Sequence, residues 1–253
     1  MEHMHGWHLV IYGTAGLLMS ILSGIAGAGA GFVMSPLAIV LGLSPAQAIS
    51  SGKFNGLAVT IGSLTGLRAH KTQIHKKRIV ALMALALAVG LLVPYVIRAF
   101  DSRYYRLSLG VMLLLLIPVM IYKKVGIKPH TPTTAQKVLG SIFLTGSLFL
   151  QGAFSGGLGS LVNIVLMGFL GQTANEAHIT KRLSQIVLNT TIIVSVIGDK
   201  LIVWQAAAVG ASTMMVGSYI GGRIAVKKGD GFAIYIMLGL MFASSLALII
   251  GAF

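Results

Sequence analysis

Lys53 and Arg182 are basic side chains that lie inside long apolar stretches of this chain. Lys53 is in the run 46–68, about 10 Å along a helix from its start, and Arg182 is at the matching depth in the run 174–197. A cation at the middle of a bilayer needs a counter-charge, a water-filled cavity or a ligand. We therefore expect Lys53 and Arg182 to converge on a bound anion. The alternatives are snorkelling to a headgroup or a structural pair with Glu176.

Two glycine-rich stretches provide the second part of the expected site, because each precedes a short apolar run, at 31–43 and 158–171. Glycine lets backbone amides approach a ligand, and a helix that begins there would direct free N–H groups and its positive dipole end at the loop. Ordinary helix packing at glycine is the alternative. The predicted binding glycines are Gly27, Gly29, Gly31, Gly156, Gly157 and Gly159.

Hydroxyl and amide side chains on the two cation-bearing runs could donate hydrogen bonds to the oxygens of a small oxyanion. For a single Ser or Thr, a hydrogen bond to its own helix is the alternative role. The predicted polar ligands are Ser51, Asn55, Thr180 and Gln185.

The elements that must position these residues are membrane helices. The 253 residues are 56 % hydrophobic and 9 % charged, whereas a soluble chain has about a quarter charged residues. Ten apolar runs fill nearly the whole chain and leave no room for a soluble domain; the second and seventh are shorter than the roughly 20 residues of a full crossing. We expect an all-α, polytopic protein of the lipid bilayer, with these two runs in broken or re-entrant helical hairpins.

The chain contains an internal duplication. A constant offset of 129 residues carries Gly42 to Gly171 and Lys53 to Arg182 without gaps. We assign 1–128 to the first repeat, a glycine-loop hairpin plus three helices, and 129–253 to the second. Each repeat has five runs, and an odd number of crossings inverts the second repeat in the membrane, as in many transporters. If the hairpins are re-entrant, three crossings remain and the inversion persists.

The net charge of +14 is concentrated in short gaps between the runs, which favours a role in membrane orientation over nucleic-acid binding. Twelve Lys and Arg residues lie in the loops 68–78, 123–137 and 223–228, against four on the opposite face. By the positive-inside rule these loops are cytoplasmic, and both termini are extracytoplasmic.

These features together predict a secondary transporter of small anions that works by alternating access around a cationic site near the membrane midplane. An anion channel with the same basic pore is the alternative. A saturable uptake rate would favour the carrier, and single-channel currents would favour the pore. A membrane enzyme has less support because no clustered acid–base pair is present, and a scaffold has no use for two buried cations.

Few groups could couple such transport to protons, because the chain has five acidic residues. Glu176, with His178 two residues away, and Asp199 are the candidates, and a position at a helix end is the alternative for each. The chain has no cysteine, Walker loop, HExxH or GxSxG motif. We expect no catalytic residue, no metal site and no cofactor.

The glycine loop and the turn after it are similar to a known family. Residues 23–36 read Ser-Gly-Ile-Ala-Gly-Ala-Gly-Ala-Gly-Phe-Val-Met-Ser-Pro, and 41–51 read Leu-Gly-Leu-Ser-Pro-Ala-Gln-Ala-Ile-Ser-Ser. This pattern, with its degenerate second copy, resembles the TauE/SafE sulfite exporter family, also called TSUP permeases. The resemblance implies secondary transport of sulfur-containing anions, such as sulfite, thiosulfate or organosulfonates. It also implies a multi-pass protein of the bacterial inner membrane and allows a homodimer.

The chain departs from that family pattern at three places. Alanines interrupt the first glycine run, Val165 stands opposite Pro36, and the second copy has two adjacent cations, Lys181 and Arg182. The doubled cation favours a doubly charged anion.

Overall fold

The computed structural model describes residues 6–26, 30–67, 76–99, 102–123, 130–154 and 158–228, and 239, 242, 244–246 and 248–250 near the C-terminus. Every regular element in this part of the chain is helical, which confirms the all-α prediction. The helices are α1 (Gly6–Ala26), α2 (Gly31–Val40), α3 (Pro45–Leu67), α4 (Lys76–Ala99), α5 (Ser102–Lys123), α6 (Thr134–Phe154), α7 (Gly159–Gly168), α8 (Ala174–Val196), the 3-10 turn η2 (Ile197–Asp199) and α9 (Trp204–Lys228).

Three described helices are long and apolar enough to cross a membrane: Gly6–Ile25, Lys76–Ala99 and Thr134–Phe154. They belong to α1, α4 and α6. Large apolar side chains such as Leu92 and Ile142 are exposed on the outer surface, at 59 % and 63 %. An outer surface of this kind is suited to lipid. Most of the last apolar run, 229–252, lies outside the described residues.

The helices α2 and α7 have ten residues each, which gives a length of about 15 Å, half of a bilayer core. Each ends before a glycine in the left-handed region, Gly42 with φ 101° and Gly171 with φ 65°. Because an L side chain is strained there, glycine lets the chain turn directly into the next long helix. The short second and seventh runs are therefore short helices followed by tight turns.

The helices after these turns begin with the same reciprocal cap. Ser44 Oγ accepts from the backbone N–H of Gln47, while Gln47 Oε1 accepts from the N–H of Ser44 at 3.0 Å. Thr173 and Glu176 form the equivalent capping box at the start of α8. Such a box satisfies two helix N–H groups that otherwise lack acceptors. The matched caps agree with the 129-residue offset between the two repeats.

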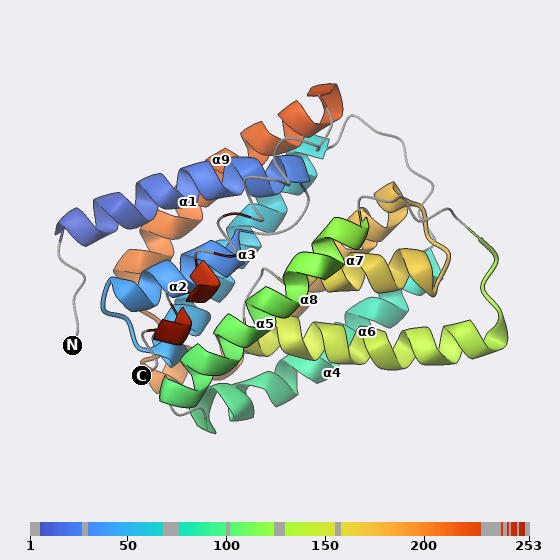
Figure 1. Cartoon of the computed structure of the whole chain (residues 1–253), viewed down its shortest axis with the longest axis horizontal. Coiled ribbons are helices and arrows are strands. Elements are labelled where there is room, and N and C mark those ends of the chain that lie inside the picture. The colour runs from blue at the N-terminus through green and yellow to red at the C-terminus, as the bar shows by residue number, and fades with distance from the viewer. Residues whose placement is uncertain are drawn as a thin grey trace.

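The long helices of one proposed repeat pack against those of the other. Figure 1 shows α1 running beside α9, whereas α6 lies beside α4. Likewise, α3 packs on α9 while α8 packs on α4, and α3 and α8 contact each other. This packing of the helices of each repeat on those of the other is the pattern expected of two related halves. It puts the two cation-bearing helices, α3 and α8, in the centre. The inversion of the second half relative to the membrane stays a prediction.

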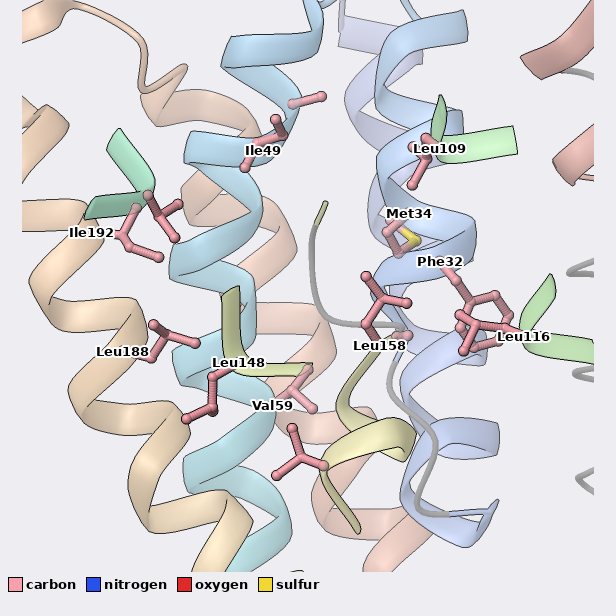
Figure 2. Packing of buried hydrophobic residues seen from close by; sticks show 14 of the residues in the cluster. Phe32, Met34, Ile49, Val59, Leu109, Leu116, Leu148, Leu158, Leu188 and Ile192 are labelled. Atoms are coloured by element: carbon pink, nitrogen blue, oxygen red, sulfur yellow. The ribbon is translucent and has the colours of Figure 1, made fainter. Parts of the chain in front are cut away.

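Apolar contacts and close glycine contacts hold the centre together. Figure 2 shows Leu188 and Ile192 of α8 pointing toward α3, where Ile49 is also fully buried. Between α1 and α9, a Cβ built on Gly24 would lie 2.9 Å from backbone atoms of Gly221. Since lipid tails are as apolar as leucine, such close backbone packing stabilises membrane helices.

Candidate anion-binding site

Arg182 of α8 lines a small central cavity. Its side chain is 2 % exposed, and its Nε and Nη2 have no hydrogen-bond partner among the described residues. The cavity has a volume of about 40 Å³, which is room for roughly three waters or a small oxyanion. An unpaired buried guanidinium is costly, so the cavity favours an occupant that accepts hydrogen bonds. The lining residues are Tyr12, Ala30, Gly31, Met34, Ser35, Gly52, Asn55, Gly56, Val59, Thr60, Arg182, Gln185 and Met214.

The N-terminus of α2 reaches the same cavity through Ala30 and Gly31. The carbonyl of Ala30 accepts from the N–H groups of Val33 and Met34 at 3.2 Å each. The first N–H groups of a helix have no acceptor within it, and they form its positive end. The guanidinium and the helix terminus therefore place positive potential around one cavity, which attracts an anion. Of the predicted glycines, Gly31 lies at this site.

Two amide side chains add hydrogen-bonding groups to the cavity. Asn55 Nδ2 donates to the hydroxyl of Tyr12 at 2.8 Å, and its Oδ1 has no partner in the described part of the chain. Gln185, 7 % exposed, also lines the cavity. Both amides were predicted ligands, and the structure brings them together with Arg182. Tyr12 was missed, although a hydroxyl within an otherwise apolar run was a usable signal.

Lys53 occupies a different position from its counterpart. It is 2 % exposed, and its Nζ donates to the backbone carbonyl of Gln151 at 3.1 Å. Gln151 lies in the last turn of α6, where carbonyls lack intrahelical donors and form the negative end of the helix. Lys53 compensates this helix end and is not among the residues that line the cavity at Arg182. The predicted convergence of both cations on one cavity is thus not seen in this arrangement.

A second group of nitrogen atoms surrounds the start of α7. A Cβ built on Gly159 would lie 3.1 Å from Gln185 Nε2, 3.4 Å from Gln151 Nε2 and 3.6 Å from Lys181 Nζ. These side chains approach because glycine leaves the space open. Gln185 also lines the cavity at α2, so it connects the N-termini of both short helices.

The other predicted ligands lie elsewhere or outside the described residues. Ser51 Oγ accepts from the N–H of Val203 at 2.9 Å, which ties α3 to the segment before α9. Thr180 is buried but is not part of the cavity lining. The glycines outside the described residues are Gly27, Gly29, Gly156 and Gly157.

The three candidates for proton coupling do not line the cavity either. Glu176 accepts from the N–H of Thr173 at 3.0 Å within the capping box, and His178 is half-buried on α8. Asp199 pairs with Arg98 at 2.7 Å between partly exposed side chains. The described residues include no group of three side chains that could hold a metal ion.

Comparison with known protein families gives a match along nearly the whole chain. A family model described as sulfite exporter TauE/SafE matches residues 12–248. The matched span includes Tyr12, Lys53, Arg182 and both short helices. No curated protein matches the chain.

Proposed function

The chain belongs to the sulfite exporter TauE/SafE family, a family of membrane transporters, and from that premise we propose that it carries small sulfur-containing anions by secondary transport. In this proposal the chain binds and moves its substrate without chemical change. Sulfite, thiosulfate and organosulfonates are the candidate substrates.

The observation that carries this proposal is the buried guanidinium of Arg182, which lines a cavity at a helix N-terminus and has two nitrogens without a partner among the described residues. A sulfur oxyanion presents several acceptor oxygens to this fork of donors. Asn55 and Gln185 lie within the same lining and offer amide groups to the remaining oxygens. Lys53 contributes a second positive charge nearby on α3, from its place at the end of α6.

Transport in this proposal comes from movement of one repeat against the other. The contact of α3 with α8 lies at the centre of the packing between the two repeats. The hydrogen bond from Lys53 to Gln151 also connects α3 to α6. Rocking about this centre would expose the cavity to one side of the membrane and then to the other. We place the protein in the bacterial inner membrane, with the loops 68–78, 123–137 and 223–228 cytoplasmic.

The small cavity favours a carrier over an anion channel, because a pore must hold a continuous water-filled path. The two are separated by measuring uptake into proteoliposomes over a range of anion concentrations. Saturation at a carrier-like rate supports transport, whereas single-channel currents in planar bilayers would support the channel.

The direct test replaces Arg182 with Met and measures uptake of labelled sulfite, thiosulfate or a sulfonate. We expect wild-type protein to take up at least one of these in preference to a carboxylate. Arg182→Met should reduce uptake about tenfold or more, since a hydrogen bond to a charged group contributes roughly 1.5–3 kcal/mol.

The matched control is Lys77→Met, which removes an exposed cation at the start of α4. It should transport normally. Normal uptake by a correctly folded Arg182→Met protein would overturn the proposed site, while loss in both variants would point to a general charge effect.

A further inference from the structure

A larger cavity lies beside the opposite end of α7 from Gly159. Its volume is about 430 Å³, and it is bounded by the first turns of α4 and α6 and by residues at and after the end of α7. Among the residues that the structure describes, it shares no lining residue with the cavity at Arg182. The transport site proposed above therefore does not account for it.

The lining of this cavity changes from charged to apolar along two helices. Arg78 and Lys137 lie in the first turns of α4 and α6, and both side chains are exposed. Seven residues further along the same helices, about 10 Å deeper, the lining consists of Leu85 and Leu144. Leu166 of α7 adds a buried apolar wall. A phospholipid has the same polarity gradient, with a phosphate at one end and hydrocarbon at the other.

The electrostatic field at the charged end is positive from two sources. Arg78 and Lys137 stand at helix N-termini, whose own dipole ends are positive. The first turns of α4 and α6 contain no acidic residue. Cations at this end of a helix are normally unfavourable, and a phosphodiester between them would relieve the repulsion.

Gln172 gives an independent sign that the cavity holds a ligand. Its side chain is 3 % exposed, it lines the cavity, and its Oε1 accepts no hydrogen bond from the residues that the structure describes. A buried acceptor without a donor is costly. A headgroup hydroxyl would supply the donor.

We propose that this cavity binds one anionic phospholipid with a hydroxylated headgroup, of the phosphatidylglycerol type. Its phosphodiester lies between Arg78 and Lys137, its headgroup hydroxyl donates to Gln172, and the upper part of an acyl chain lies along Leu85 and Leu144. Basic pockets between membrane helices at a membrane surface are suited to such lipids. This inference is independent of which anion the protein transports.

The test is native mass spectrometry of the purified chain with phosphatidylglycerol and with phosphatidylcholine of the same acyl chains. We expect one phosphatidylglycerol to bind preferentially. The double variant Arg78→Gln and Lys137→Gln should weaken its binding about thirtyfold, at roughly fivefold for each cation near the membrane surface. The charge-conserving pair Arg78→Lys and Lys137→Arg should restore most of the affinity.

The matched control is the pair Lys76→Gln and Lys77→Gln, exposed cations from the same turn of α4 that do not line the cavity. It should bind phosphatidylglycerol within about twofold of wild type, since it removes equal charge outside the pocket. Equal binding by the wild type and the Arg78/Lys137 double variant would overturn the proposal. Equal loss in both double variants would overturn it too, because it would show unspecific surface attraction.

A second arm separates a lipid from a free anion. Water-soluble glycerophosphoglycerol has the same headgroup without acyl chains, and it should bind about tenfold or more weakly than the lipid, because each buried methylene contributes about 0.8 kcal/mol. Equal binding of the two would assign the cavity to a free phosphate compound and overturn the lipid proposal.

Discussion

Lys53 and Arg182 occupy equivalent positions in the two proposed repeats but meet opposite ends of helices. Lys53 donates to a carbonyl in the last turn of α6, at 3.1 Å. Arg182 lines the cavity at the first residues of α2, and two of its nitrogens have no described partner. Each cation thus meets a helix of the other repeat.

The difference between the two sites follows from the chemistry of helix ends. A helix C-terminus presents free carbonyl acceptors, so it satisfies a buried cation within the protein. A helix N-terminus presents donors, which cannot satisfy a cation and add to its positive potential. In our proposal the cation beside the N-terminus binds an external anion, whereas its counterpart has an internal acceptor. One duplicated position can in this way serve structure in one half and binding in the other.

The largest expected effect is a divergence between Lys53→Met and Arg182→Met in thermal melting. Lys53→Met should lower the stability by about 1–3 kcal/mol, because the Gln151 carbonyl loses its donor. Arg182→Met should leave the stability unchanged or raise it, because it removes a buried charge whose Nε and Nη2 have no partner in the described part of the chain. Melting in detergent measures both. The reverse order of stabilities would break the comparison.

The same two variants should differ in their response to ligand. A bound anion raises the melting temperature of the wild type by linkage. This rise should persist in Lys53→Met and disappear in Arg182→Met. If the rise in melting temperature were lost only in Lys53→Met, the anion would bind at Lys53, and our assignment of the site to Arg182 would be wrong.

An intermediate effect is expected at the start of α7, where the 129-residue offset carries Ala30 of the first repeat to Gly159. A Cβ on Gly159 would come within 3.1 Å of Gln185 Nε2. Gly159→Ala should therefore displace this amide and weaken anion binding about three- to tenfold. This change corresponds to the loss of part of the free energy of one hydrogen bond. Gly146→Ala on α6, where an added Cβ would meet no atom of the described residues within 4 Å, serves as the control. Equal losses in both variants would show that the effect comes from adding a methyl group to a membrane helix and not from displacing Gln185.

The smallest effect is expected from the helix caps. Gln47 of α3 accepts a hydrogen bond from the N-cap N–H in the same way as Glu176 of α8. Glu176→Gln should keep the capping box and normal uptake, at a cost of about 0.5 kcal/mol for the lost charge at a helix N-terminus. Uptake measured with and without a pH gradient checks this. If the response to the gradient vanished, Glu176 would be a proton-coupling residue and the two caps would not be equivalent.

Much of the fold could be predicted from the sequence, because it depends on local features. The length of the apolar runs predicted membrane helices, and the two short runs predicted the short helices α2 and α7. The burial of Lys53 and Arg182 within the protein also followed from their places within apolar runs. The inversion of the repeats and the repeat boundary at 128/129 stay predictions.

The candidate site was predictable only in part. Arg182, Asn55, Gln185 and Gly31 were predicted and line one cavity. Ser51 was expected to face the anion, but its hydroxyl accepts from Val203 instead. Position along a helix gives the depth of a side chain, whereas its partner depends on which neighbouring helix faces it.

The sequence by itself determined an all-helical membrane chain, two buried cations at one register and glycines where short helices turn back. Only the tertiary structure decided that one cation meets carbonyls and the other a cavity. The physical reason is range: a hydrogen bond acts over about 3 Å, yet Lys53 and Gln151 are separated by 98 residues of sequence. Which end of a distant helix arrives beside a charge depends on the packing of all the helices together.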